Sequence, residues 1–261
     1  MELSGKTAFV SGSSGGIGYA VASALSAEGV DVVVNGRDFA RVDAAVARLQ
    51  REHPGSRPSG LVADFSEPAD VQRLLEALGA VDILVNNVGL FDLAPFELIT
   101  DEVWDRYLAV NVMSGVRMSR HLLPGMLDRG WGRIIFISSE SGVNVPADMV
   151  HYGVTKAAVL ALANGLAKRT RGTAVTINSV LGGPTYSDGV AATVEALAQE
   201  HGVPAETFKA SVIGQNTTTL LNRFLDPAEI AHLVTYLASP LASATNGAAV
   251  RADGGALTGV L

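Results

Sequence analysis

The chain has 261 residues, of which 48% are apolar and 17% are charged, and it contains no cysteine. This length and apolar fraction suffice for a full hydrophobic core, so they exclude intrinsic disorder. The 19 basic and 26 acidic residues give a net charge of −7, and because no basic block is present we expect no nucleic-acid partner.

Metal binding and membrane association are also disfavoured. Without cysteine the chain cannot form disulfides or thiolate zinc sites, and its five histidines are scattered, so we expect no metal site. No apolar run reaches the roughly 18 to 20 residues that a membrane helix needs. Residues 1–6 lack the charged and apolar segments of a secretion signal. We therefore expect a soluble, cytoplasmic protein that does not bind membranes.

Short β-branched runs alternate with longer helical patterns along the chain. This alternation is typical of an α/β fold, in which helices cover both faces of a parallel sheet. No linker interrupts the pattern, so we expect a single domain over residues 1–261. The predicted strands are Thr7–Ser11, Asp31–Asn35, Gly60–Asp64, Asp82–Asn86, Arg133–Ser138, Ala174–Val180 and Ala248–Arg251.

Two helix starts carry capping signals, and one long segment carries no strand. Asp226, followed by Pro227 and Glu229, predicts an N-cap acceptor, a proline in the first turn and a capping box. The Ser-Glu-Pro sequence at 66–68 predicts a similar helix start. Residues 185–222 show helical patterns only, and because structureless loops of this length are uncommon we expect a lid or substrate-binding insertion.

A glycine-rich turn follows the first predicted strand. It reads Ser-Gly-Ser-Ser-Gly-Gly-Ile-Gly over residues 11–18, and a helical pattern opens behind it. Glycines in such a turn let backbone N–H groups approach a pyrophosphate at the N-terminus of a helix. The order strand, turn, helix favours this interpretation over a flexible Ser/Gly turn. The residues expected to bind the dinucleotide here are Gly12, Ser14, Gly16, Ile17 and Gly18.

The end of the second strand bears on the choice between NAD and NADP. An acidic residue there would bind the adenosine ribose of NAD, but this chain has Gly36 followed by Arg37. A guanidinium can pair with the 2′-phosphate of NADP, which a carboxylate would repel. NADP(H) is therefore favoured and NAD(H) stays possible, with an ordinary surface role for Arg37 as the alternative.

Polar residues close the third and fourth strands. Asp64 ends the third, and Asn-Asn-Val-Gly at 86–89 ends the fourth. Ligands of open parallel sheets bind at the carboxyl ends of strands, so Asp64, Asn87 and Gly89 are candidate cofactor contacts. On spacing alone, Asp64 fits a turn or helix-capping carboxylate about equally well.

Tyr152 and Lys156 stand four residues apart at the start of a predicted helix and therefore share one face. An ammonium beside a phenol favours the phenolate and lowers the pKa of the phenol, which would let Tyr152 exchange a proton near neutral pH. A Tyr-x-x-x-Lys pattern that stands alone usually has no catalytic function, so only the other motifs of the chain can indicate whether this pair is catalytic.

Together these motifs resemble the classical short-chain dehydrogenase/reductases over nearly the whole chain. The family turn Thr-Gly-x-x-x-Gly-x-Gly is matched with Ser11 in place of threonine, and the family's Asn-Asn-Ala-Gly is matched at 86–89. The family's catalytic serine stands thirteen residues before its tyrosine, which selects Ser139 rather than Ser138. The resemblance implies one doubly wound Rossmann domain with a seven-stranded parallel sheet.

The resemblance also implies residue roles. Tyr152 would act as general acid or base, Lys156 would lower its pKa and bind the nicotinamide ribose, and Ser139 would hydrogen-bond the substrate oxygen. Asn111 would hold a water through which protons reach Lys156. Taken in isolation, Ser139 fits a strand-end cap and Asn111 a structural helix amide.

One motif departs from the family pattern. Where the family usually has Pro-Gly beside the nicotinamide, this chain has Gly182-Gly183. Loss of the proline leaves φ free, so we expect a more mobile loop. Gly183 and Thr185 remain candidate cofactor contacts, although an ordinary turn hydroxyl fits Thr185 nearly as well.

The implied function is hydride transfer between a nicotinamide cofactor and a carbonyl or secondary alcohol. A lyase or dehalogenase on the same fold typically replaces the lysine with arginine, and a dinucleotide-sensing regulator would lose the tyrosine or lysine, so the intact motifs argue against both. The substrate is not predicted. Candidate wall residues are Leu90, Phe91, Glu140, Val145, Met149, Tyr186 and residues 190–213.

Residues 150–167 predict a helix that is apolar or small on every face. Since an outer helix exposes one side to water, a partner subunit is the natural cover. Family members commonly pair this helix and the preceding one, here roughly Asp101–Asp128. We therefore expect a homo-oligomer, a tetramer rather than a dimer.

Overall fold

The computed structural model describes residues 1–215 and 219–260, except for the side chain of residue 215. Seven strands form one parallel sheet, as predicted. Their order is β3-β2-β1-β4-β5-β6-β7. The third strand ends before Asp64, which therefore lies in the following loop. The strands are β1 (Thr7–Val10), β2 (Asp31–Gly36), β3 (Ser59–Val62), β4 (Ile83–Asn86), β5 (Trp131–Ser139), β6 (Ala174–Gly182) and β7 (Ala249–Ala252).

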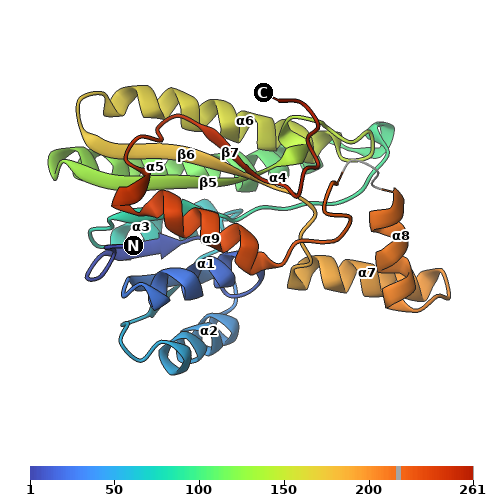
Figure 1. Ribbon diagram of the computed structural model, residues 1–261, viewed down its shortest axis with the longest axis horizontal. Helices are drawn as coiled ribbons and strands as arrows, with labels where there is room; N and C mark the ends of the chain where they lie inside the picture. Colours follow the sequence, from blue (N-terminus) through green and yellow to red (C-terminus); the bar gives the residue numbers. More distant parts are fainter. Residues whose placement is uncertain (216–218, 261) are drawn as a thin grey trace.

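Helices cover both faces of the sheet (Figure 1). Apolar side chains of α1, α2 and α9 pack on one face, and those of α3, α5 and α6 pack on the other. Because the central strands are buried on both faces, they are apolar runs rather than alternating patterns. The helices are α1 (Gly16–Ala27), α2 (Phe39–Glu52), α3 (Pro68–Ala77), α4 (Asp101–Tyr107), α5 (Met113–Asp128), α6 (Val150–Ala167), α7 (Asp188–Glu200), α8 (Ala205–Gln215) and α9 (Pro227–Ala238).

The strand order reverses between β1 and β4. Strand β1 pairs with β2 on one side and with β4 on the other, so the connections that leave β1 and β4 turn to opposite faces. This reversal opens a crevice at the carboxyl ends of the two strands. The glycine-rich turn after β1 and the loop after β4 both border it.

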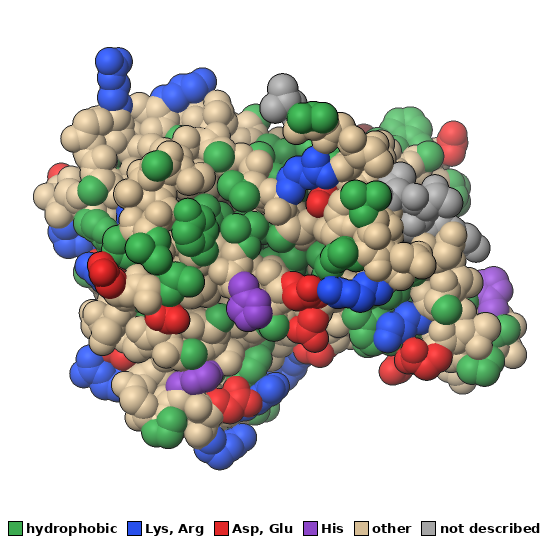
Figure 2. Space-filling model, viewed as in Figure 1, with side chains coloured by type: hydrophobic (Ala, Val, Ile, Leu, Met, Phe, Trp, Pro, Cys, Tyr) green, Lys and Arg blue, Asp and Glu red, His purple; other side chains and the backbone are tan. Residues whose placement is uncertain are grey.

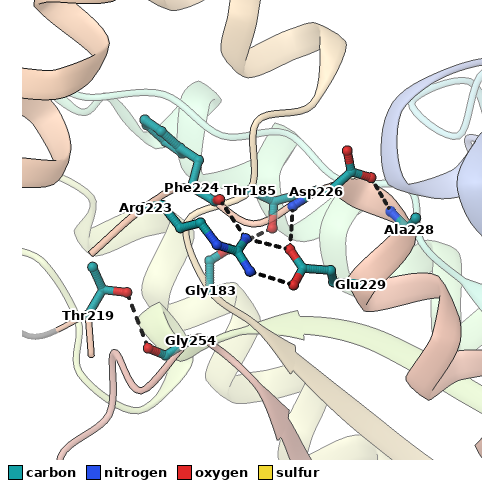
Figure 3. Close-up of polar contacts among 9 residues, drawn as sticks. All are labelled: Gly183, Thr185, Thr219, Arg223, Phe224, Asp226, Ala228, Glu229 and Gly254. Atoms are coloured by element: carbon teal, nitrogen blue, oxygen red, sulfur yellow. Dashed lines mark hydrogen bonds and ion pairs between the residues drawn. The ribbon is translucent and has the colours of Figure 1, made fainter. Parts of the chain in front are cut away.

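Helix α9 begins with the predicted capping box (Figure 3). The Asp226 side chain accepts a hydrogen bond from the Ala228 N–H at 2.8 Å, and Glu229 accepts one from the Asp226 N–H at 2.8 Å. Arg223 binds both carboxylate oxygens of Glu229, at 2.7 and 2.8 Å. These hydrogen bonds, from Arg223 first, lower the pKa of Glu229 to about 2. The cluster fixes the start of α9.

The predicted capping at residues 66–68 is wrong in one respect. Helix α3 begins at Pro68, but its N-cap Glu67 makes no side-chain cap hydrogen bond. The Ser66 hydroxyl instead donates to Asp64 Oδ1 at 2.7 Å. Ser66 therefore stabilises the turn before α3 rather than the first turn of the helix.

The predicted helix over Asp101–Asp128 is unbroken, but it is not α-helical throughout. Helix α4 ends at Tyr107, Leu108–Val112 form a π-helical turn, and α5 starts at Met113. A π-turn widens the helix locally and is common at functional sites. Asn111 lies within this turn.

The segment after β6 projects from the end of the sheet as α7 and α8 (Figure 1). A pairing between Thr185 and Leu225 joins its two ends. Residues 216–218 of the predicted 185–222 insertion lie outside the described residues, and its lid function stays a prediction. Figure 2 shows basic and acidic side chains interspersed on one face of the molecule. No helix within the described ranges is long and apolar enough to cross a bilayer.

Candidate active site

The glycine-rich turn has a backbone that only glycine adopts readily. Gly12 and Gly16 have φ values of +61° and +55°, in the left-handed region. A Cβ on Gly18 would lie 2.3 Å from the Gly12 carbonyl oxygen and 2.6 Å from Asn87 Nδ2. The first turn of α1 therefore packs directly on the loop, which leaves no room for a side chain there.

Two asparagines hold this turn in place. Asn87 Nδ2 donates to the carbonyl oxygens of Ser11 at 2.9 Å and Gly12 at 3.0 Å. Asn35 Oδ1 accepts from the Gly12 N–H at 3.0 Å. Asn87, predicted to contact the cofactor, thus directs its amide to the turn. Asn35 was not predicted as a site residue. Its position, as a polar residue at the end of an apolar strand, could have indicated a role at this edge of the sheet.

The turn already binds an anionic oxygen. The Gly16 N–H, at the N-terminus of α1, donates to Asp188 Oδ2 at 2.9 Å. The helix dipole and free N–H groups favour negative charge at this position. The glycine cradle and this carboxylate contact together fit the pyrophosphate of a dinucleotide.

An arginine-lined cavity of about 260 Å³ adjoins the turn. Its walls include Arg37, Arg41 and Arg106, together with Ser14 and Asp64. Burial opposes ionisation of Asp64, but hydrogen bonds from Ser66 and the charges of Arg37 and Arg106 outweigh it and lower the pKa of this carboxyl. Arg37 and Arg106 therefore lie close enough to Asp64 to act on its charge.

The acidic residue nearest to the end of β2 serves another purpose. Asp38 is the N-cap of α2, and its side chain accepts from the Arg41 N–H at 2.8 Å. Gly36 packs against Ser14, since a Cβ there would lie 2.8 Å from Ser14 Oγ. Arg37 and Asp38 both line the cavity, so the end of β2 offers it a guanidinium, and the carboxylate beside this guanidinium is held as the cap of α2.

A second cavity, of about 320 Å³, holds the predicted catalytic residues. It shares Gly89 and Leu90 with the arginine-lined cavity, so the two are neighbours along one cleft. The structure brings these predicted residues together in its lining: Ile17, Asn87, Gly89, Ser139, Tyr152, Lys156, Gly183 and Thr185.

Close backbone contacts set the position of the catalytic helix. Ser138 Oγ, at the end of β5, donates to the Lys156 carbonyl at 3.0 Å. A Cβ on Gly142 would lie 2.9 Å from the Lys156 carbonyl carbon, and one on Gly153 would lie 2.8 Å from the Ser141 carbonyl oxygen. The loop after β5 therefore lies directly against α6, which places Ser139 beside Tyr152.

The expected lowering of the Tyr152 pKa is wrong for the structure without a cofactor. Burial raises the pKa of Tyr152 to about 12, and the charge of Glu140 adds to this effect, while a hydrogen bond from Ser139 opposes it. Lys156 Nζ donates to the Ile137 carbonyl at 2.9 Å and lies 5.5 Å from the Tyr152 ring centroid. Burial lowers the pKa of Lys156 to about 8.

Asn111 ties three segments together through the π-turn. Its Oδ1 accepts from the Leu90 N–H at 2.7 Å, and its Nδ2 donates to the Leu90 carbonyl and to Thr155 Oγ1, both at 3.0 Å. Thr155 in turn donates to the Tyr152 carbonyl at 2.7 Å. Asn111 therefore links the loop after β4 to α6. Thr155 was not predicted.

The loop after β6 packs closely on the end of β7. A Cβ on Gly183 would lie 2.3 Å from the Asp253 carbonyl oxygen, so only glycine fits. Thr185 Oγ1 donates to the Gly183 carbonyl at 2.9 Å. The predicted walls are wrong in part. Of residues 190–213 only Val190 lines the cavity, Tyr186 packs edge-on against Phe224, and Val145 is exposed beside Gly153.

Known proteins are similar to this chain in sequence and in structure over nearly its whole length. The family described as short chain dehydrogenase matches residues 6–198. The chain is 40% identical to the uncharacterized oxidoreductase YvaG of Bacillus subtilis, covering 100% of this chain and 99% of that protein. It is 35% identical to D-beta-hydroxybutyrate dehydrogenase of Cupriavidus necator, covering 97% and 98%.

Among solved structures, L-sorbose reductase of Gluconobacter frateurii, complexed with NADPH and L-sorbose, superposes with a TM-score of 0.94 at 31% identity, covering 100% of both chains. These matches favour redox chemistry over the lyase and regulator alternatives. The chain belongs to the short-chain dehydrogenase family, and it is an NAD(P)-dependent oxidoreductase of carbonyl and secondary alcohol groups.

Proposed function

We propose that this enzyme is an NADP(H)-preferring ketone reductase that also oxidises the corresponding secondary alcohols. The observation that carries the proposal is the shared lining of one cavity by Ser139, Tyr152 and Lys156, next to a cavity lined by three arginines. A proton donor and a site for an anionic dinucleotide thus meet in one cleft.

Tyr152 is the proposed proton donor to the carbonyl oxygen. Burial holds its pKa at about 12, so the phenol is protonated at neutral pH, which is the form that reduction requires. Ser139 would hydrogen-bond the same oxygen. Lys156 would hold the cofactor ribose, and its pKa of about 8 lets it exchange protons in the range where the enzyme works.

The residues proposed to hold the cofactor extend along the cleft. Gly12, Gly16 and Gly18 would face the pyrophosphate, and Gly89, Gly183 and Thr185 would border the nicotinamide. When bound, NADP(H) supplies or accepts the hydride. Asn111 is a proposed positioning residue, because its contacts fix Leu90 against α6. Its predicted water-holding role stays a prediction.

We propose that the enzyme prefers NADP(H) to NAD(H) because of the positive charges at one end of the cleft. Arg37, Arg41 and Arg106 line the adenosine end of the cleft, and guanidinium groups bind phosphate strongly. The L-sorbose reductase of similar structure was solved with NADPH, which supports the same choice. Arg41 was not among the predicted contacts.

A substrate screen tests this proposal. Purified enzyme is mixed with a panel of ketones and either NADPH or NADH, and loss of absorbance of the reduced cofactor is followed. We expect turnover with at least one ketone and a higher kcat/KM for NADPH. Cofactor binding without reduction of any ketone or oxidation of any secondary alcohol would contradict the proposal.

We also propose that the enzyme is a cytoplasmic homo-oligomer, a tetramer rather than a dimer. The outer faces of α5 and α6 border a cavity of about 510 Å³ lined by Val116, Leu123, Leu127, Leu162 and Leu166 among others, and Val154 of α6 is 43% exposed. Light scattering at micromolar concentration should give a mass that is a multiple of the chain mass. Ala161→Arg, on the exposed face of α6, should give a lower mass than the wild type. A monomeric wild type would contradict the proposal.

A further inference from the structure

Glu140 places a carboxylate beside the reacting position. It follows Ser139 directly at the end of β5 and lines the same cavity as Tyr152. Its Oε2 accepts hydrogen bonds from Ser139 Oγ at 3.0 Å and from the Ser141 hydroxyl. The carboxylate is therefore one hydrogen bond away from the serine proposed to bind the substrate oxygen.

This carboxylate has no cation beside it. Within residues 1–215 and 219–260, Glu140 takes part in no ion pair. Burial raises its pKa, the hydrogen bonds from Ser141 and Ser139 oppose this effect, and the negative charge of Asp253 adds to it. Asp253 is itself paired with Arg251 at 3.0 Å. The charges near Glu140 thus give it no compensation for burial.

The position of Glu140 also works against the catalytic tyrosine. Its negative charge raises the pKa of Tyr152, which disfavours the phenolate needed for alcohol oxidation. Glu140 is half-buried, and a carboxylate that is partly removed from water without a counter-charge costs free energy of folding. Locally unfavourable groups in active sites usually serve the ligand, so Glu140 calls for a substrate group that completes its hydrogen bonding.

We propose that Glu140 is a specificity-determining residue that accepts a hydrogen bond from a donor, a hydroxyl or an ammonium group, on the carbon next to the reacting carbonyl. This inference rests on the proposed function, in which Ser139 contacts the carbonyl oxygen. Ser139 Oγ lies 3.0 Å from Glu140 Oε2 and has one proton to donate. When Ser139 donates that proton to the carbonyl oxygen, it releases Glu140 Oε2, and a donor one carbon away from the carbonyl can take its place.

The same geometry selects against anions. A carboxylate or phosphate on that carbon would face Glu140 in a largely buried site, where like charges repel strongly. Other walls of the cavity are apolar and include Leu90, Phe91 and Met149. The favoured substrates are therefore α-hydroxy or α-amino ketones with an apolar remainder.

Four probes of similar size test the inference: 1-hydroxy-2-butanone, 1-amino-2-butanone, 3-pentanone and 2-oxobutanoate. For the wild type we expect kcat/KM for the hydroxy or the amino ketone to exceed that for 3-pentanone by about tenfold or more, and 2-oxobutanoate to be the poorest. A higher kcat/KM for the hydroxy ketone indicates that Glu140 prefers a neutral donor, and a higher kcat/KM for the amino ketone indicates that it prefers a cationic one.

Variants of Glu140 supply the decisive comparison. Glu140→Gln should lower the preference for the donor-bearing ketones several-fold and raise kcat/KM for 2-oxobutanoate, because it removes the charge and keeps the shape. Glu140→Asp should keep the rejection of 2-oxobutanoate. Glu76→Gln, which removes one negative charge from the exposed face of α3, is the matched control and should leave all four values unchanged.

The outcomes separate the two proposals. Equal loss on all four probes in Glu140→Gln, with NADPH affinity retained, would assign Glu140 a structural role and overturn the inference. If Glu140→Gln does not fold, a wild type that reduces 3-pentanone as well as its donor-bearing analogues overturns it and leaves the proposed function intact. Failure of the wild type on every ketone would instead overturn the proposed function.

Discussion

The two ends of the cleft are built in different ways. At the cofactor end, the turn after β1 packs so closely that a Cβ on Gly18 would lie 2.3 Å from a carbonyl oxygen, and Asn35 and Asn87 hydrogen-bond its backbone. At the substrate end, α7 buries only Val194 and Ala198 of its 13 residues. Close backbone contacts fix the glycine-rich turn, whereas only a few buried side chains hold α7 against the rest of the domain.

This difference in construction bears on how each region tolerates substitution. Close backbone approach leaves few residue types possible, so the cofactor end is marked by recognisable glycines and asparagines. Helices held by few apolar contacts can change their sequence and position at little cost in stability. We therefore expect substitutions at the anchored end to affect the reaction and the cofactor, and those in the insertion to have smaller effects.

The largest effect is expected at Tyr152. Tyr152→Phe removes the hydroxyl while leaving the phosphate turn unchanged, so kcat should fall at least 100-fold with unchanged NADPH affinity. Stopped-flow kinetics and NADPH fluorescence measure the two quantities. Tyr236→Phe, on the partly exposed face of α9, is the control. A Tyr152→Phe enzyme that keeps more than about one per cent of kcat would remove Tyr152 from this role.

The Lys156 ammonium should be required for activity and should at the same time lower the free energy of unfolding. Its pKa falls from 10.5 to about 8 because the ammonium is buried. Below pH 8 the folded and unfolded chains both carry the charge, so folding bears the full burial cost, at most about 3 kcal/mol. Between pH 8 and 10.5 the folded chain releases the proton first, and the cost disappears as pH rises.

Lys156→Met should therefore be inactive and have a higher free energy of unfolding at pH 7, with the gain shrinking between pH 8 and 10.5. The loss of the hydrogen bond to the Ile137 carbonyl reduces the net gain. Urea denaturation at several pH values provides the measurement. A variant less stable than the wild type at pH 7, or a gain independent of pH, would show that burial does not dominate at this site.

Arg37 tests the adenosine end of the anchored region. Arg37→Asp replaces an attractive charge with a repulsive one, so kcat/KM for NADPH should fall about 10- to 100-fold and that for NADH much less. Arg51→Asp, the same charge change at the far end of α2, should leave the ratio of the two cofactors unchanged. An unaltered ratio in Arg37→Asp would make Arg37 a simple surface cation.

The smallest effect is expected at the first residue of α7. The Asp188 carboxylate occupies the Gly16 N–H that the pyrophosphate would need, so Asp188→Asn should tighten NADPH binding a few-fold. Glu195→Gln, exposed on the same helix, controls for the net charge. Weaker binding in Asp188→Asn would mean that Asp188 supports the cofactor site instead, and the two ends of the cleft would be more strongly coupled than we infer.

Some features could be predicted because they follow from local patterns. The seven strands, the capping box at Asp226 and the position of Tyr152 and Lys156 on one helix depend on neighbouring residues only. The π-turn around Asn111 could not be predicted this way, because its residues look helical and the widening depends on contacts with Leu90 and Thr155. The second role of Asn87, as a support for the turn, was hidden for the same reason.

The amino-acid sequence by itself determined the α/β fold, the family and the edge of the sheet that carries the candidate active site, since strand ends and glycine turns are encoded locally. Only the tertiary structure decided how the side chains at that edge are charged. Burial of Tyr152 raises a pKa that the nearby lysine was expected to lower, and Glu140 lies against Ser139 without a cation. Both effects depend on which segments distant in sequence surround these side chains, and spacing along the chain does not specify them.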